Sequence, residues 1–260
     1  MTAETQTRVN RPLVVELVGS PGAGKTTLVA GIKASLARSG LVVATPNENV
    51  RDFTRRKGLG RMVPGGLARP LLWLLYRWGS QAAALKYLAV HPRLAWLVIS
   101  TATRRPSDSL ARARRPLHWF LRLLGTHQHL LKRGRAGEVI VLDEGFLHKA
   151  VQLFSSPVEK PASDSVATYV AGIPATDLVI HVSAPVSTCA NRVRLRGVWP
   201  RLGEIGDEQL SAFIANAHDT VELAVAAART MGRTVVTLDN GGELPESAGY
   251  DAALHTLVSL

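Results

Sequence analysis

The sequence predicts an α/β protein with one parallel sheet of five strands, and three observations support this fold class. Five apolar runs rich in β-branched residues have the length of buried strands. They cover residues 13–18, 41–45, 138–143, 178–183 and 234–239. Helical segments lie between these runs, as crossovers between parallel strands require. The first run leads directly into a glycine-rich loop and a helix, a common order at the ligand-binding edge of such a sheet.

The clearest helices follow the first strand and precede the last one. Residues 25–38 form the first of these helices, and Gly40 ends it. Residues 207–231 place apolar side chains such as Leu210, Ile214 and Val221 at helical spacing, and Gly232 closes the segment. A chain of 260 residues can bury one substantial core, so we expect residues 1–260 to form a single domain with helices flanking its sheet.

A long basic segment separates the second strand from the third. It contains no convincing strand, so we expect a large helical insertion over residues 51–135. The segment has 18 Lys and Arg against two acids, whereas the rest of the chain has 13 basic and 18 acidic residues. We expect the insertion to contact an anionic ligand or a membrane surface, and a solvated set of Arg-rich helices is the alternative. The sequence carries no strong signal for nucleic acid.

The most apolar pieces of the insertion are residues 69–78 and 94–99. Neither has the roughly 18 to 20 apolar residues that a bilayer span requires. They predict either core helices of the insertion or helices that lie on a membrane, where Trp, Tyr and Arg beside Leu are favourable. Residues 1–6 lack a secretory pattern, and Cys189 is the only cysteine. We therefore expect a cytoplasmic location, with peripheral attachment to a membrane as an extension.

The strand at residues 13–18 is followed by Gly-Ser-Pro-Gly-Ala-Gly-Lys-Thr-Thr, which fits the phosphate-loop pattern at every fixed position. Glycines let backbone N–H groups approach phosphate oxygens, and the positive end of the next helix adds to the field. Lys25 is expected to reach the β- and γ-phosphates of ATP, and Thr26 to bind Mg²⁺. The residues expected to bind the nucleotide are Gly19, Ser20, Pro21, Gly22, Ala23, Gly24, Lys25, Thr26 and Thr27.

A second element of the expected site is the acidic end of the third strand, Val139-Ile140-Val141-Leu142-Asp143-Glu144. Open α/β sheets bind ligands at the carboxyl ends of their strands, so Asp143 is placed to hold Mg²⁺ or its waters, or to accept a proton. The alternative is a carboxylate that only caps the following helix.

These two motifs together resemble P-loop kinases of the nucleoside and nucleotide monophosphate kinase group, and thymidylate kinase-like proteins most closely. The resemblance covers roughly residues 12–50 and 136–240. It implies that residues 192–206 form a lid whose arginines close over the transferred phosphoryl group. Arg192, Arg194 and Arg196 would then be catalytic, and Arg201 could complete the clamp. Fixed guanidinium groups suit the charge that develops in phosphoryl transfer. The alternative is a solvated helix end.

The chain also departs from this family. Thymidylate kinases have an Arg after the strand-end Asp, whereas Glu144 stands here. The pair Asp143-Glu144 is similar to the acidic pair of P-loop ATPases, in which the second carboxylate orients water. Glu48 is similar in placement to the general base of deoxynucleoside kinases, with an ordinary loop glutamate as the alternative. We expect the base to be Glu48 or Asp143. Phe146, His148 and Lys149 are candidates for lining the acceptor site, with a surface or capping role as the alternative for His148.

The expected function is therefore an ATP- and Mg²⁺-dependent phosphotransferase that acts on a small molecule, nucleoside- or nucleotide-like by resemblance. The alternative is a P-loop ATPase or nucleotide switch whose basic insertion docks to a membrane, glycan or nucleic-acid partner. His127 and His129 in the insertion could suggest a metal site, but no cysteine or carboxylate stands at ligand spacing, which favours an ordinary structural role.

Overall fold

In the part of the chain that the structure describes, the sheet has five parallel strands, as the sequence predicts. The computed structural model describes residues 11–44, 68–104, 110–133, 137–197, 206–242 and 256. The strand order across the sheet is β2-β3-β1-β4-β5. The strands are β1 (Leu13–Val18), β2 (Val42–Ala44), β3 (Glu138–Leu142), β4 (Leu178–Ser183) and β5 (Val235–Asp239).

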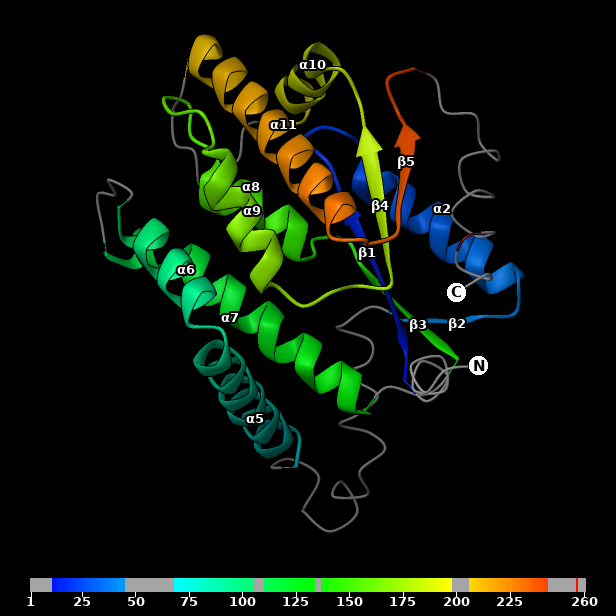
Figure 1. Ribbon diagram of the computed structural model, residues 1–260. Coiled ribbons are helices and arrows are strands. Elements are labelled where there is room, and N and C mark those ends of the chain that lie inside the picture. The colour runs from blue at the N-terminus through cyan, green and yellow to red at the C-terminus, as the bar shows by residue number, and fades with distance from the viewer. Residues whose placement is uncertain are drawn as a thin grey trace.

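The central strand β1 determines where the glycine-rich loop lies. It pairs with β3 through Leu13 to Glu16 and with β4 through Val15 to Val18, all in parallel. Because every strand has the same direction, the residues that follow β1, β3, β4 and β5 meet at one carboxyl edge. This edge is at the top of Figure 1, where the strand arrows point.

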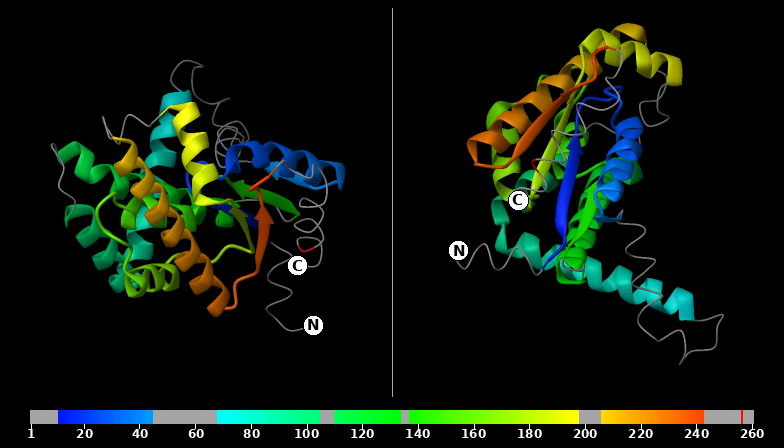
Figure 2. Two further views of the ribbon diagram at one scale, coloured as in Figure 1. Left: turned by 90° about the horizontal axis from the view of Figure 1, so that it is seen from above. Right: turned by 90° about the vertical axis from the view of Figure 1, so that its right-hand side faces the viewer.

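Helices cover both faces of the sheet (Figure 2). The side chains of Val15 and Leu17 face α2, and they share a hydrophobic cluster with Leu28 and Ile32 of that helix. The opposite face carries α7, α8, α9 and α11. The helices are α2 (Lys25–Arg38), α5 (Ala68–Val90), α6 (Pro92–Arg104), α7 (Leu110–Arg133), α8 (Phe146–Phe154), α9 (Ser163–Gly172), α10 (Val186–Arg196) and α11 (Asp207–Thr230).

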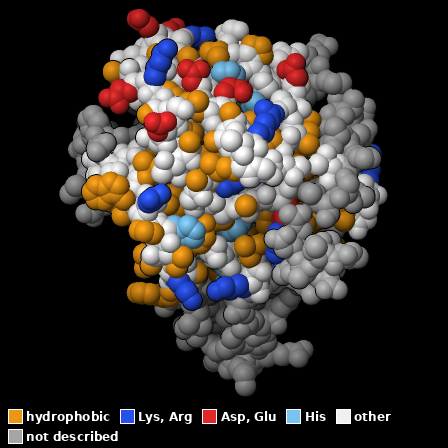
Figure 3. All heavy atoms as spheres, in the orientation of Figure 1, with side chains coloured by type: hydrophobic (Ala, Val, Ile, Leu, Met, Phe, Trp, Pro, Cys, Tyr) orange, Lys and Arg blue, Asp and Glu red, His pale blue; other side chains and the backbone are white. Residues whose placement is uncertain are grey.

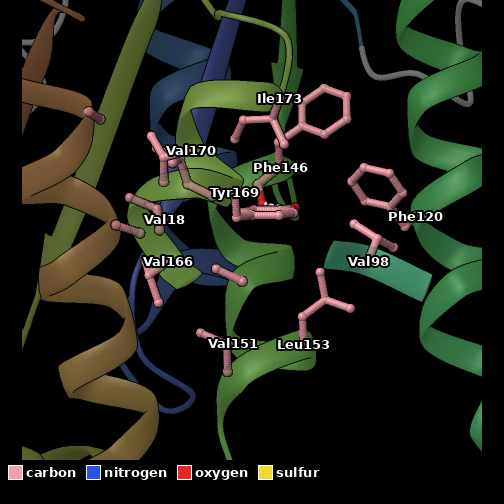
Figure 4. Close-up of a cluster of buried hydrophobic side chains, with 14 of the residues drawn as sticks. Val18, Val98, Phe120, Phe146, Val151, Leu153, Val166, Tyr169, Val170 and Ile173 are labelled. Carbon is pink, nitrogen blue, oxygen red and sulfur yellow. Dashed lines mark hydrogen bonds between the residues drawn. The ribbon is translucent and has the colours of Figure 1, made fainter. Parts of the chain in front are cut away.

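The described part of the basic insertion is helical, as predicted, and forms α5, α6 and α7. It shares a core with the body of the protein, since Leu94, Val98 and Phe120 cluster with Phe146 and Tyr169. Figure 4 shows Val98 and Phe120 on one side of this cluster, opposite Tyr169 and Phe146. The buried faces of the insertion helices are therefore used for packing within the chain.

Within the described ranges, no single helix is both long enough and apolar enough to cross a membrane. One pair of helical segments, Tyr76–Val90 and Pro92–Thr103, meets this test only when the two are taken together, and they are bent by 109°. Both segments contribute buried side chains to the core, among them Ala84, Leu88 and Leu94.

Candidate active site at the carboxyl edge of the sheet

The glycine-rich loop between β1 and α2 adopts a conformation that its glycines alone allow. Gly22 and Gly24 have φ angles of 84° and 91°, in the left-handed region. A Cβ atom at Gly22 would lie 2.3 Å from the carbonyl oxygen of Cys189, and one at Gly24 would lie 2.2 Å from Nδ2 of Asn240. The loop is thus packed closely against α10 and the end of β5.

The side chain of Lys25 folds back onto the start of the loop. Its Nζ donates hydrogen bonds to the carbonyl oxygens of Gly19, at 2.7 Å, and Ser20, at 3.0 Å. Burial lowers the pKa of Lys25 to about 8, and nearby Glu144 opposes this shift. The ammonium group is therefore charged at neutral pH and lies against the loop carbonyls of Gly19 and Ser20.

The first turn of α2 is suited to an anion. Gly24 precedes the helix and offers no side-chain cap, and the first turn contains no acidic residue. Thr26 and Thr27 are exposed there. Backbone N–H groups at the start of a helix lack partners within the helix and carry a partial positive charge, so they attract phosphate.

Two carboxylates follow β3 directly. Asp143 is exposed, and its Oδ1 accepts a hydrogen bond from the backbone N–H of Glu144 at 3.0 Å. Oε2 of Glu144 forms an ion pair with Nζ of the buried Lys149 at 2.8 Å. Both carboxylates raise the pKa of Lys25 and so favour its charged form, Glu144 more strongly than Asp143. The structure thus brings the predicted Lys25 and Asp143 to the same end of the sheet.

A buried glutamate beneath this acidic turn is absent from the sequence predictions. Glu16, in the middle of β1, is fully buried, and its Oε1 accepts hydrogen bonds from the backbone N–H groups of Leu147 and His148 at the start of α8. Among the described residues, Oε2 of Glu16 has no hydrogen-bond partner. Burial raises the pKa of Glu16 to about 7, against the lowering effect of these N–H groups.

The three predicted arginines of α10 divide into two groups because they lie on different sides of the helix. Arg192 donates from Nη1 to the carbonyl oxygen of Asn240 at 3.0 Å, and the charge of Arg196 lowers the pKa of Lys25. Arg194 instead faces α11, where it contacts Asp207 at 3.3 Å and Ser211 at 2.8 Å. The structure brings Arg192 to the loop through Asn240, and Arg196 lies one turn further on the same side of α10. Arg194 lies on the other side, against α11.

Two further residues that contact the loop were missed by the sequence analysis. Nδ2 of the buried Asn240 donates to the carbonyl oxygen of Ala23 at 2.6 Å, and its backbone N–H donates to Ser183 at 2.7 Å. Nδ1 of His218, on α11, lies 3.3 Å from Oγ of Ser20. The position of Asn240 directly after the last strand was the only local signal. Nothing in the sequence around His218 points to the loop.

Other expected site residues lie outside the described part of the chain or are buried. Glu48, Arg201 and the lid beyond Gly197 up to residue 205 lie outside the described residues. Phe146 is wholly buried and belongs to the hydrophobic core, so the prediction that it lines an open acceptor site is wrong. His148, for which a surface or capping position was the alternative, is buried in the first turn of α8.

The histidines of the insertion have no ligand set in the described part of the chain. Burial lowers the pKa of His127 to about 4, and no group of three or more metal-ligating side chains is found among the described residues. Thr26 and Asp143 are exposed and carry the oxygen atoms that Mg²⁺ would take as ligands, together with phosphate oxygens and water. The backbone cradle of the loop and the charge of Lys25 fit the phosphates of a nucleotide.

The fold and this edge together are those of an α/β protein with a P-loop. The Zeta toxin family model matches residues 1–55, which include the loop. Two solved structures of deoxyadenosine kinase from M. mycoides are similar to the chain, one with the product dCMP and a flexible dCDP and one with dCTP. Each is 14% identical and covers 95% of this chain and 100% of its own, with TM-scores of 0.40 and 0.39. Comparison with curated proteins gives no match.

Proposed function

We propose that the chain is a kinase that transfers the γ-phosphoryl group of ATP to a small-molecule acceptor. The observation that carries this proposal is the convergence of three charged elements on one loop. These elements are Lys25, which binds two loop carbonyls, the Asp143 turn after β3, and Arg192 on α10, which reaches the loop through its contact with Asn240. Phosphoryl transfer depends mainly on positioning and on stabilising negative charge, and such a set of groups provides both.

Each group has a distinct role in the proposal. Backbone N–H groups of residues 22–27 and the start of α2 hold the phosphates, and Lys25 exchanges its two loop carbonyls for phosphate oxygens. Thr26 and Asp143 hold Mg²⁺, which when bound offsets the charge of the phosphates. Arg192 and Arg196 stabilise the charge that spreads over the oxygens of the transferred group.

The acceptor in this proposal is nucleoside- or nucleotide-like. Support comes from the sequence resemblance to nucleoside and nucleotide monophosphate kinases, thymidylate kinase-like proteins in particular. The acceptor hydroxyl or phosphate would approach the open side of Asp143, and the base would be Asp143 or Glu48. A screen of nucleosides, nucleoside monophosphates and sugars by acceptor-dependent ADP release tests this assignment. If no acceptor of these classes raises ADP release above the acceptor-free rate, the assignment fails.

The role of Asp143 can be tested by Asp143→Asn, which keeps the shape of the side chain and removes its charge. We expect ATP binding to persist, while turnover and its dependence on Mg²⁺ are largely lost, because a neutral amide is a poor ligand for a hard cation. The exposed Asp164 at the start of α9 offers a control, since Asp164→Asn should leave turnover unchanged. Full Mg²⁺-dependent turnover of Asp143→Asn would move the metal role to another residue.

A second candidate function is a P-loop ATPase or switch. Glu144 favours the ATPase, because this carboxylate follows Asp143 directly. It also raises the pKa of Lys25 more strongly than Asp143 does. In an ATPase of this kind the second carboxylate would orient the attacking water, so Glu144→Gln should trap bound ATP and stop hydrolysis. The ion pair of Glu144 with Lys149 argues for the kinase instead, because it holds the carboxylate in a salt bridge.

A further inference from the structure

An exposed apolar surface lies on the insertion helices, away from the carboxyl edge of the sheet. We call it the α5–α6 face and define it by Trp78, Leu85, Trp96 and Ile99. Trp78 and Trp96 are 69% and 73% exposed, although tryptophan is usually well buried. Trp78 and Leu85 are seven residues apart and therefore lie on one side of α5, as Trp96 and Ile99 do on α6.

Exposed cations lie beside this face, and its two helices contain no acidic residue. Residues 68–104 and 110–133 contain eleven Lys and Arg and neither Asp nor Glu. Lys86 and Arg93 are exposed beside the apolar side chains, and Arg122 of α7 stacks over the half-exposed Trp119 at 5.2 Å. Figure 3 shows hydrophobic side chains along the lower left edge with Lys and Arg among them, while most acidic side chains of this view lie near the top.

We propose that the α5–α6 face binds peripherally to a bilayer that contains anionic lipids. Tryptophan and aliphatic side chains are stable at the boundary between head groups and acyl chains, and neighbouring Lys and Arg attract anionic head groups. The face lies parallel to the surface and does not span it, because the buried sides of both helices belong to the protein core.

The charge pattern distinguishes this partner from a second copy of the chain. A symmetric dimer through the α5–α6 face would place the cations of one copy against those of the other, which is unfavourable without acids to pair them. A nucleic acid would attract the cations, but it offers no apolar layer for Leu85 and Ile99. An anionic bilayer satisfies both the apolar and the cationic side chains of the face.

The test is co-sedimentation of the full chain with vesicles of equal parts phosphatidylglycerol and phosphatidylcholine, compared with phosphatidylcholine alone. We expect binding to the anionic vesicles that weakens as salt is raised. Trp96→Ala should weaken the partition constant about tenfold by removing apolar contact, and Lys86→Gln about fivefold by removing one cation. Val158→Ala and Lys160→Gln, at exposed positions outside this face, are matched controls and should bind like the unaltered chain.

Three outcomes would overturn the proposal. The first is no binding to anionic vesicles at low salt, and the second is equal binding to both kinds of vesicle. The third is self-association without vesicles that Trp96→Ala abolishes, which would make the face an interface between copies. Each variant is also assayed for thermal unfolding and nucleotide turnover. Both should be unchanged, since the altered side chains are exposed and neither α5 nor α6 lies at the carboxyl edge (Figure 1).

Discussion

At the scale of single residues, burial changes the pKa values of side chains in and beneath the site. Lys25 is the main case, because its ammonium group is held by two carbonyl oxygens in place of water. Removing a cation from water favours its neutral form, which lowers its pKa. A bound phosphate would reverse this shift by adding negative charge beside the ammonium group.

A pH dependence of nucleotide affinity follows from Lys25. Its pKa of about 8 in the free protein means that the ammonium form is complete below that pH and is lost above it. We expect the affinity for ATP to fall by up to about tenfold per pH unit as the pH rises above about 8. Fluorescence titration with an ATP analogue measures this. Lys25→Arg should remove the dependence, because guanidinium stays charged. An equal slope in that variant would assign the pH effect to another group.

Asn240 supplies the second prediction at this scale. Asn240→Ala leaves the buried carbonyl of Ala23 without its donor, and an unmet buried hydrogen bond costs about 1 to 3 kcal/mol. We expect weaker nucleotide binding, by roughly tenfold, because the loop loses its anchor to β5. Asn191→Ala on the exposed side of α10 is the control. Unchanged affinity in Asn240→Ala would mean that the loop holds its shape without this contact.

At the scale of elements, β1 and α8 are joined by Glu16. This carboxylate accepts from the first N–H groups of α8, and α8 starts just after the Asp143-Glu144 turn. Gly145 is required between them, because a Cβ there would meet the Glu16 carboxylate at 2.3 Å. These backbone N–H groups and the Arg233 guanidinium lower the pKa of Glu16. Burial raises the pKa of Tyr169 most, and the charge of Glu16 raises it further.

The stability of the fold should depend on pH through Glu16. Its pKa rises from 4.5 to about 7 on folding, so the folded chain holds this proton more tightly than the unfolded one. The resulting stabilisation is complete below about pH 4.5 and is lost as the pH rises through about 7, by at most roughly 3 kcal/mol. Glu16→Gln should therefore be more stable than the unaltered protein at pH 8 in urea unfolding, with little difference at pH 5. A variant that is less stable at pH 8 would contradict this.

At the scale of the whole molecule, sequence patterns predicted the architecture because they are local. Strand runs, the glycine loop and Asp143 each carry their signal within a few residues, and all five strands are found. The contacts of His218 and Glu16 join segments far apart in the chain, so no local pattern could reveal them. The position of Asn240 after the last strand indicated the right edge of the sheet but not its contact with Ala23. The orientation of Arg194 likewise depends on where α11 packs against α10.

A kinase site consumes ATP rapidly only after an acceptor has bound, and measuring ADP release with and without acceptor distinguishes it from an ATPase site. ADP release is followed with and without the best acceptor from the screen, for the unaltered chain, Arg196→Ala and Glu144→Gln. The kinase account predicts slow release until the acceptor is added, and a loss in Arg196→Ala that affects turnover far more than ATP affinity. Brisk acceptor-free release that Glu144→Gln abolishes and Arg196→Ala leaves unchanged would contradict the account and identify an ATPase.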